Sequence, residues 1–278
     1  MVTAPTILVF DSGLGGLTVF REVVKARPDA HFLYIADDAF FPYGNHGEAE
    51  LIGRVTALIG DLIEAYRPDI IVIACNTAST LVLPQLRARF SVPFIGTVPA
   101  IKPACAASLS RLVSVLGTEA TVRREYTHAL IRDFSNGTEV TLVGAARLAA
   151  FAEAELNGVP VKDAAIAQEI APCFVERNGR RTDTIVLACT HYPLLLHRLT
   201  RLAPWAVAFI DPAAAIARRL LDLAGLPGDE RSSPSRILFT SGRTPSPALM
   251  AALARFGIGS YHSENANRAD SKMTGPPG

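Results

Sequence analysis

Two cysteines stand in nearly the same local sequence, one in each half of the chain. Cys75 follows the apolar run 70–74, and Cys189 follows the run 184–188. Each run is short and β-branched, which predicts a strand buried on both faces. Polar residues and then a helical pattern follow each cysteine. We therefore expect each thiol at the carboxyl end of a strand, just before a helix N-terminus.

That position suits a thiol that moves protons beside a small anion. Free N–H groups and the positive dipole end of a helix favour anions and lower the pKa of a thiol. Two thiols on opposite faces of a carbon could exchange its proton, one removing it and the other returning one, so that the configuration inverts. The carbanion formed between these steps needs hydrogen bonds to the substrate carboxylate and exclusion of water.

Polar residues near the two cysteines could supply these hydrogen bonds. Asn76, Thr77, Thr118 and Thr190 are placed for it, and the hydroxyl of Thr121 could reach the same ligand from the first turn of a helix. Asp11, after the first strand, and His191, two residues after Cys189, could tune each thiol or help to move its proton. Pro42, Tyr43 and Gly44 are residue types that favour a tight turn. They could also place backbone and hydroxyl donors at the rim of the site.

The elements that must hold these residues alternate between strand and helix along the whole chain. The fold class is therefore α/β, with parallel sheets flanked by helices and two similar, pseudo-symmetric domains that have the active site between them. We expect a first domain over 1–98 plus 211–262, a second over 99–210, and a disordered tail over 263–278. The expected strands are 6–10, 31–36, 70–74, 92–99, 111–116, 139–143, 184–188, 207–212 and 236–241. The expected helices are 17–27, 50–66, 78–90, 100–108, 147–155, 163–176, 194–202, 212–224 and 247–256.

Composition sets further bounds on the function. The chain has 278 residues, 49% of them hydrophobic and 19% charged, so it can bury a sizeable core. The net charge of +1 gives no electrostatic argument for binding nucleic acid or a membrane surface. Four cysteines without close spacing fit reduced thiols in a cytoplasm. We find no signal peptide and no apolar stretch long enough to span a bilayer.

Several motifs, taken in order, resemble those of the cofactor-independent aspartate/glutamate racemase superfamily, and in particular the glutamate racemases. The resemblance reaches from the N-terminus to about residue 224. The motifs are Asp11-Ser12-Gly13-Leu14-Gly15-Gly16-Leu17, Pro42-Tyr43-Gly44, Ala74-Cys75-Asn76-Thr77-Ala78-Ser79, Val98-Pro99-Ala100-Ile101-Lys102, Gly117-Thr118 with Thr121, and Leu187-Ala188-Cys189-Thr190-His191-Tyr192-Pro193-Leu194.

The resemblance implies interconversion of L- and D-glutamate, which supplies D-glutamate for peptidoglycan, by a cytoplasmic homodimer with no cofactor and no metal. It implies that Cys75 and Cys189 are the acid/base thiols and that Asp11, His191 and Glu153 assist them; Glu153 is placed near His191 by the resemblance alone. It also implies a substrate shell formed by Asp11, Ser12, Pro42, Tyr43, Gly44, Asn76, Thr77, Thr118, Thr121, Thr190 and His191.

The sequence departs from the pattern of this family at three places. Ala145-Ala146 stand where a Cys-Pro pair is usual, and Phe40-Phe41 stand where a basic residue is common. Glu119 and Arg123-Arg124 follow Gly117-Thr118 where small or hydroxyl residues are frequent. These departures concern the dimer contacts, the rim of the site and the specificity for the substrate side chain.

Other interpretations stay open at this point. Within the enzymes, an aspartate racemase or another two-cysteine racemase has the same thiol motifs, and outside them a non-catalytic binder of a dicarboxylic amino acid has the same fold. A metal site of Cys75, Cys189, Asp11 and His191 lacks closely spaced ligand pairs. Lys102 could form a Schiff base with pyridoxal phosphate, but no phosphate loop accompanies it. The glycines of 11–16 do not have the spacing of a dinucleotide fingerprint.

Overall fold

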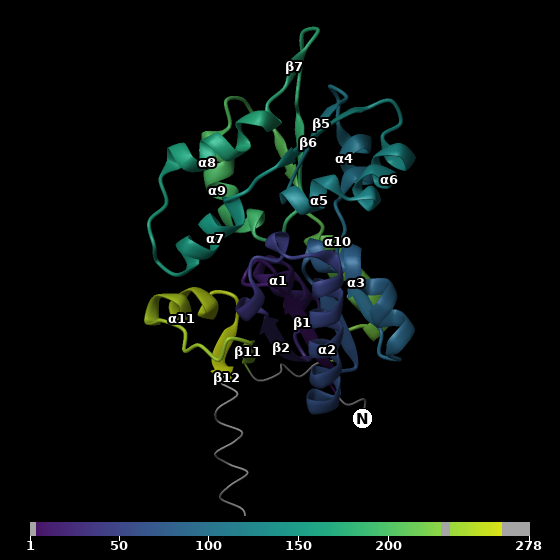
Figure 1. The fold of residues 1–278 in the computed structure, drawn as a ribbon, viewed down its shortest axis with the longest axis vertical. Helices are drawn as coiled ribbons and strands as arrows, with labels where there is room; N and C mark the ends of the chain where they lie inside the picture. Colours follow the sequence, from purple (N-terminus) through teal and green to yellow (C-terminus); the bar gives the residue numbers. More distant parts are fainter. Residues whose placement is uncertain (1–3, 229–233, 263–278) are drawn as a thin grey trace, which may run out of the picture.

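Two parallel sheets, one above the other, form the frame of the protein (Figure 1). The computed structural model describes residues 4–228 and 234–262. The larger sheet has the strand order β12-β11-β2-β1-β3-β4, and the smaller has the order β10-β9-β5-β6. All strand pairs in both sheets are parallel. This confirms the predicted fold class, parallel sheets flanked by helices.

The elements have the following bounds. The strands are β1 (Thr6–Asp11), β2 (His31–Ala36), β3 (Ile70–Ile73), β4 (Phe94–Gly96), β5 (Leu112–Gly117), β6 (Glu139–Gly144), β7 (Glu176–Arg177), β8 (Arg180–Arg181), β9 (Thr184–Leu187), β10 (Ala208–Ile210), β11 (Ser235–Phe239) and β12 (Ile258–His262). The α-helices are α1 (Leu17–Ala26), α2 (Glu48–Tyr66), α3 (Asn76–Arg89), α4 (Ile101–Ala107), α5 (Glu119–Arg123), α6 (Glu125–Phe134), α7 (Leu148–Leu156), α8 (Asp163–Ile170), α9 (Leu196–Leu202), α10 (Ala213–Ala224) and α11 (Pro247–Ala254). Short 3-10 helices are η1 (Asp38–Phe40), η2 (Tyr43–Asn45), η3 (Ala171–Cys173) and η4 (Tyr192–Leu195).

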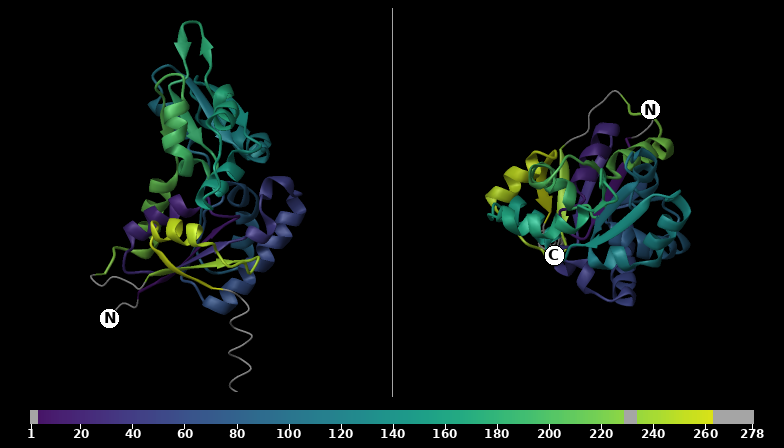
Figure 2. Two further views of the ribbon diagram at one scale, coloured as in Figure 1. Left: turned by 90° about the vertical axis from the view of Figure 1, so that its left-hand side faces the viewer. Right: turned by 90° about the horizontal axis from the view of Figure 1, so that it is seen from above.

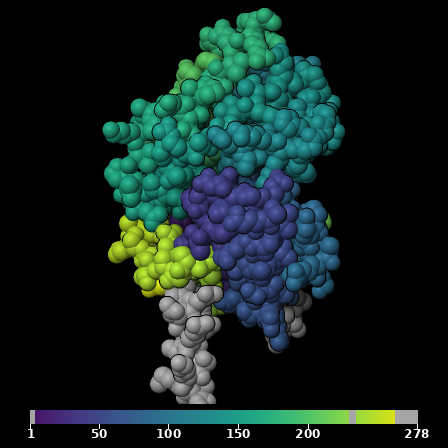
Figure 3. All heavy atoms as spheres, in the orientation of Figure 1, coloured from purple at the N-terminus to yellow at the C-terminus, as the bar shows by residue number. Residues whose placement is uncertain are grey.

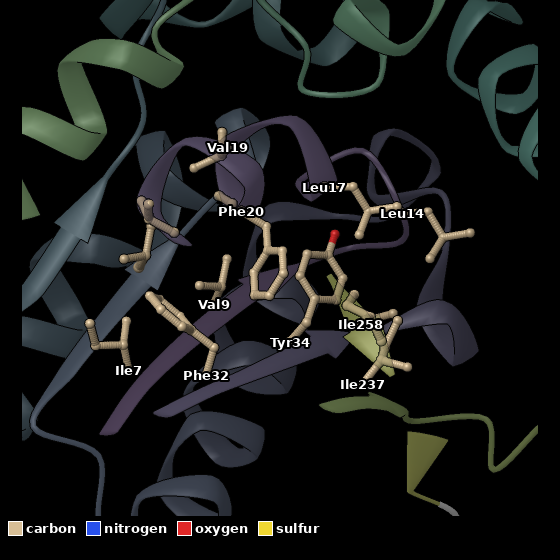
Figure 4. Close-up of a cluster of buried hydrophobic side chains, with 14 of the residues drawn as sticks. Ile7, Val9, Leu14, Leu17, Val19, Phe20, Phe32, Tyr34, Ile237 and Ile258 are labelled. Carbon is tan, nitrogen blue, oxygen red and sulfur yellow. The ribbon is translucent and has the colours of Figure 1, made fainter. Parts of the chain in front are cut away.

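The larger sheet is buried on both faces because its central strands are apolar along their middle residues. Along β1, Ile7 and Val9 belong to one hydrophobic cluster, whereas Leu8 and Phe10 belong to the cluster on the opposite face. This alternation is the two-residue period of a strand. Figure 4 shows the first cluster, where the ring of Tyr34 lies beside that of Phe20, with aliphatic side chains around them. Helices cover both faces of this sheet, as the two turned views in Figure 2 show.

The strand order creates one reversal in each sheet. In the larger sheet the chain passes from β1 to β2 on one side and then returns to β3 on the other side. In the smaller sheet β5, β6 and β9 have the same relation. At such a reversal the following connections diverge, which opens a crevice beyond the carboxyl ends of the strands. The two central strand pairs, β1–β3 and β5–β9, thus define two equivalent positions for a ligand.

The structure corrects several element boundaries. The predicted helix over 163–176 is wrong beyond Ile170: a 3-10 turn containing Pro172 follows, and β7 then forms a hairpin with β8. Proline has no N–H for the helical hydrogen bond, and Asn178-Gly179, both with positive φ, form the hairpin turn. The strand expected over 92–99 shortens to β4, and α3 begins at Asn76 rather than Ala78.

Three further expectations concern the start of α10, the C-terminal tail and membrane-spanning helices. Pro212 is the N-cap of α10 rather than its first helical residue. The tail predicted to be disordered, 263–278, lies outside the described residues. Within the described ranges, none of the helices has both the length and the apolarity that a membrane span requires.

Candidate active site

Cys75 and Cys189 lie at the two equivalent reversal positions. Each cysteine lies two residues after the end of its strand. The alanine between the strand and the cysteine makes the same backbone hydrogen bond in both halves. The N–H of Ala74 donates to Phe10 O at 2.7 Å, and the N–H of Ala188 donates to Leu116 O at 2.8 Å. Both thiols are buried, with 5% and 7% of each residue exposed. The two halves therefore present their thiols in the same way.

Both thiols line one small cavity between the two sheets. The cavity volume is about 30 Å³, which is room for a few water molecules at most. The predicted site residues on its wall are Ser12, Pro42, Tyr43, Gly44, Cys75, Asn76, Thr77, Thr118, Cys189, Thr190 and His191. Figure 3 shows the two halves meeting along a seam, with teal and green atoms above and purple, blue and yellow atoms below. The site is thus closed too tightly for an amino acid of the size of glutamate.

The Cys75 thiol has a neutral partner and a buried acid beside it. Cys75 is the N-cap residue of α3, and its Sγ donates to Ser12 Oγ at 3.6 Å. Burial and the nearby Asp11 carboxylate raise the pKa of Cys75 to about 12, although its hydrogen bonds with the N–H of Ala78 and with the Ser12 side chain oppose this shift. Cys75 therefore holds its proton near neutral pH in this state.

Asp11 links the two halves directly behind the thiols. Its side chain is completely buried, and it accepts hydrogen bonds from the N–H of Gly13 at 2.9 Å and from Thr190 Oγ1 at 3.1 Å. Burial raises the pKa of Asp11 above its usual range, while His191 and these hydrogen bonds act in the opposite direction. The bond to Thr190 spans the gap between the larger and the smaller sheet.

The Cys189 thiol has a histidine and a glutamate beside it. Nδ1 of His191 lies 3.8 Å from Cys189 Sγ, and its Nε2 lies 2.9 Å from Glu153 Oε1. The same Glu153 oxygen accepts a hydrogen bond of 2.6 Å from the N–H of Leu14, in the larger-sheet half. Burial lowers the pKa of His191, but its interactions with Cys189 and Glu153 outweigh burial and raise that pKa well above its usual value. His191 is therefore a cation near neutral pH.

The glycines after β1 let the histidine and glutamate approach this closely. A Cβ atom on Gly15 would overlap the imidazole ring of His191, and one on Gly13 would overlap the Glu153 carboxylate. Because glycine has no side chain, the loop can pack directly against both groups. In this structure the glycine-rich loop thus serves as the surface on which His191 and Glu153 rest.

Hydroxyl and amide groups occupy the rest of the wall. Thr121 is buried and does not line the cavity; its Oγ1 lies 2.9 Å from Thr118 Oγ1 and 3.5 Å from Thr77 Oγ1. Asn76 is 97% buried, and neither its Nδ2 nor its Oδ1 has a hydrogen-bond partner. Because a buried polar group without a partner costs free energy, the Asn76 amide is available to a ligand in the cavity.

A network outside the cavity holds the Pro42-Tyr43-Gly44 turn. The Tyr43 hydroxyl donates to Oδ2 of Asp37 at 2.7 Å, and Asp37 does not line the cavity. Asp37 is fully buried and also binds Arg54, whose Nη2 lies 2.6 Å from Oδ1, and Thr240 Oγ1 at 2.6 Å. The turn therefore offers the cavity its backbone and the ring of Tyr43 rather than the hydroxyl.

The remaining candidates lie elsewhere. Among residues 4–228 and 234–262, no cluster of three or more His, Cys, Asp or Glu side chains has the geometry of a metal site. All four cysteines are free thiols, and Cys105 and Cys173 are buried in the smaller-sheet half. Lys102 lies over the ring of Phe134 at 5.1 Å, in a cation–π contact.

Sequence reasoning missed three residues that shape the site. Phe41 lines the cavity, with its ring 5.3 Å from the imidazole of His191, although the sequence marked it only as a departure. Ala149 also lines it, and it lies one helical turn before Glu153 on α7, so the helical period could have placed both on one face. Asp37 was not singled out, because its partners Tyr43, Arg54 and Thr240, which lie 6, 17 and 203 residues away, form no recognisable motif with it.

Comparisons with known proteins agree with this arrangement. The model of the Asp/Glu/hydantoin racemase family matches residues 9–220. A glutamate racemase from Brucella canis is 54% identical over 255 residues, which cover 91% of this chain and 92% of that one.

Solved structures with the same fold include two that cover nearly the whole chain. The Escherichia coli glutamate racemase, in complex with L-glutamate and the activator UDP-MurNAc-ala, is 38% identical, with a TM-score of 0.85 over 93% of this chain and 97% of that one. A Bacillus anthracis glutamate racemase is 25% identical, with a TM-score of 0.76 over 94% and 97%. The chain therefore belongs to the Asp/Glu/hydantoin racemase family and is an isomerase of its glutamate racemase branch.

Proposed function

We propose that the chain interconverts L- and D-glutamate by moving a proton at the α-carbon between Cys75 and Cys189. The observation that carries this proposal is the placement of two buried thiols at equivalent strand reversals, on the wall of one shared cavity. A binding protein for a dicarboxylic amino acid has no need of such a pair. The relatives named above support glutamate as the substrate.

One turnover moves one proton from the substrate to one sulfur and one proton from the other sulfur to the substrate. The thiolate on one face takes the α-proton, and the electron pair of the broken C–H bond stays on the substrate as a carbanion. The thiol on the other face then gives its proton to the same carbon, and its sulfur becomes the thiolate. The configuration is inverted and the protonation states of the sulfurs are exchanged, so the same scheme runs in both directions.

The surroundings of the two sulfurs favour one starting arrangement. Cys75 holds its proton because burial and Asp11 raise its pKa to about 12. On the other side, Nδ1 of the protonated His191 lies 3.8 Å from Cys189 Sγ and can exchange a hydrogen bond with that sulfur. The Glu153 carboxylate orients His191 and keeps it charged. In this arrangement Cys189 is ready to remove a proton and Cys75 is ready to supply one.

The wall of the cavity supplies donors for the substrate. The unpartnered Asn76 amide and the hydroxyls of Thr77 and Thr118 can bind the carboxylate next to the reacting carbon, and the hydroxyl of Thr190 can join them when it leaves Asp11. Hydrogen bonds to that carboxylate spread the negative charge that develops when the α-proton leaves. Asp11 can hold the substrate ammonium group, since a buried acid needs a cationic partner. Ser12, Pro42, Tyr43, Gly44 and Thr121 complete the proposed shell.

Four further properties belong to the same proposal. The reaction would supply D-glutamate for peptidoglycan, as the family resemblance implies. The chain would act in the cytoplasm as a homodimer, which light scattering after size-exclusion chromatography would test. The two functional units would be 1–98 plus 211–262 and 99–210, because β11, β12 and α10 pack with the larger sheet and β10 with the smaller one.

The experiment is the far-ultraviolet circular dichroism of L-glutamate and, separately, of D-glutamate with purified protein, a reductant and no added cofactor. We expect both signals to decay to zero. If neither decays while that of aspartate does, the two-thiol scheme stands and the substrate is wrong. If no amino acid racemises, a non-catalytic binder of dicarboxylic amino acids becomes the better interpretation.

A further inference from the structure

Phe41 is a side chain of the larger-sheet half that lies against the histidine of the other half. It follows η1 and directly precedes Pro42, in the connection between β2 and α2. Phe41 lines the cavity, and the centroids of its ring and of the His191 imidazole lie 5.3 Å apart, with the ring planes tilted by 41°. Two aromatic rings at this separation are in contact. Phe41 thus reaches from its own half onto a group that the proposed mechanism uses.

Phe41 meets the pair of His191 and Glu153 at Gly13. A Cβ atom on Gly13 would lie 3.1 Å from Cδ2 of Phe41 and 3.3 Å from Nε2 of His191, and it would overlap the Glu153 carboxylate. Nε2 of His191 is also the atom that lies 2.9 Å from Oε1 of Glu153. The Phe41 ring is therefore next to the hydrogen bond between His191 and Glu153, and all three side chains pack on the same glycine.

Phe41 also lies at the boundary between this hydrogen bond and the surrounding water. Its ring is partly exposed, whereas only 2% of the His191 side chain and 15% of the Glu153 side chain are exposed. The polar and charged groups that face the imidazole include Cys189, Glu153 and the buried Asp11. An attraction between charges is stronger where water is excluded, and an apolar ring at the boundary excludes water.

We propose that Phe41 is a positioning residue that confines the imidazole of His191 and keeps water away from its hydrogen bond to Glu153. The imidazole is then held by two groups of the larger-sheet half, the backbone of Gly15 and the Phe41 ring. Nδ1 thereby stays beside the Cys189 sulfur while protons move. This inference rests on the proposed function in one respect, because its effect on the rate assumes that His191 acts through Cys189.

The direct test is the exchange of the His191 Nε2 proton with water, which proton NMR of isotope-labelled protein measures without substrate. A shielded proton between an imidazole and a carboxylate gives a resolved resonance, which the His191→Gln variant assigns. In Phe41→Ala we expect this resonance to broaden or disappear, because its exchange with water accelerates by about 10-fold or more. Phe41→Tyr keeps the ring and should keep the resonance. Equal exchange rates in Phe41→Ala and in the wild-type protein would overturn the inference, and so would a wild-type proton that already exchanges too fast to be seen.

The kinetic measurement separates positioning from contact with the substrate. Because Phe41 confines the imidazole rather than the ligand, Phe41→Ala should lower kcat by about 10-fold and change KM for D-glutamate by less than about twofold. Phe41→Tyr should recover most of kcat. A raised KM with an unchanged kcat would overturn the inference, since it would indicate a ring that only contacts the substrate.

The matched control is Phe90→Ala, which removes another partly exposed ring of the larger-sheet half. Phe90 packs against Phe94, with ring centroids 6.5 Å apart, and does not line the cavity. This variant should leave the resonance and kcat unchanged, and equal losses in both variants would indicate a general loss of packing and overturn the inference. If Phe41→Ala does not fold, Phe41→Leu takes its place and should show a smaller acceleration of exchange. A wild-type protein that racemises nothing would contradict the proposed function, and the exchange measurement would then decide this inference alone.

Discussion

Cys75 and Cys189 occupy the same backbone position in two similar halves, yet each sulfur has a different neighbour. Cys75 faces the Ser12 hydroxyl and the buried Asp11, whereas Cys189 faces the cationic His191. The fold thus makes the two thiols geometrically equivalent, while the side chains around them give each sulfur a different electrostatic environment. A two-thiol exchange needs one sulfur with a proton and one without, and the two sulfurs swap these states with each turnover.

The backbone conformation after each thiol also differs between the two halves. After Cys75 the regular helix α3 begins at once, and the N–H of Ala78 donates a hydrogen bond to the sulfur. After Cys189 the chain forms the 3-10 turn η4, and α9 begins only at Leu196. The first half therefore supplies positive potential from a helix N-terminus and the second from a histidine. At Cys75 the helix does not overcome burial and Asp11, since the pKa remains high.

The largest effect should come from removing either thiol. Cys75→Ala and Cys189→Ala should each reduce racemisation by about 1000-fold or more, because each removes one of the two acid/base groups. Each variant should still exchange the α-proton of the one enantiomer that faces its remaining thiol, which proton NMR in deuterated water would detect. Full racemisation by either variant would rule out the two-base scheme and make the comparison of the two sulfurs irrelevant.

A smaller loss should follow from disturbing the support of His191. Gly15→Ala places a methyl group where the imidazole ring lies, so the ring must move away from Cys189. We expect kcat/KM to fall by about 100-fold, since displacements of this size at an active site have such effects. Gly47→Ala is the matched control, because a Cβ there meets open space. Equal activities of the two variants would show that the position of His191 is unimportant.

Neutralising Glu153 should change the pH dependence of the reaction, and by different amounts for the two enantiomers. Glu153 helps to raise the pKa of His191, so in Glu153→Gln that pKa falls and His191 loses its proton at a lower pH. The alkaline limb of the pH–rate profile should move to lower pH, with a loss of about 10-fold above neutrality. The shift should be larger for the enantiomer whose proton Cys189 removes. Equal shifts for both enantiomers would mean that the two thiols do not differ as proposed.

The smallest effect concerns the contact between the halves. The site is closed by bonds such as that from the N–H of Leu14 to Glu153 and that from Thr190 to Asp11, around a cavity of about 30 Å³. Substrate must therefore enter an opened form, and its binding should favour the closed one. Small-angle scattering should record a slight decrease in the radius of gyration when glutamate is added. An unchanged curve at saturation would count against this motion.

The limits of sequence reasoning are clearest at the helix expected over 163–176 and at Glu153. The earlier end of the helix could have been predicted from local sequence, since Pro172 marks a break and Asn178-Gly179 mark a hairpin turn. Glu153 is different: nothing in its own neighbourhood indicates an active-site acid, and only the family resemblance identified it. Its partners, His191 and Leu14, lie 38 and 139 residues away in the sequence. No local pattern encodes such a contact.

The sequence by itself determined that each of two thiols ends a buried strand and precedes polar residues, because strand burial and helix starts follow from local hydrophobic patterns. It also determined the parallel α/β class, because strands and helices alternate. Only the tertiary structure decided that Cys75 and Cys189 share one cavity and that His191 lies against Gly15. The physical reason is that the order of the strands and the packing of the two sheets depend on contacts between residues distant in the chain.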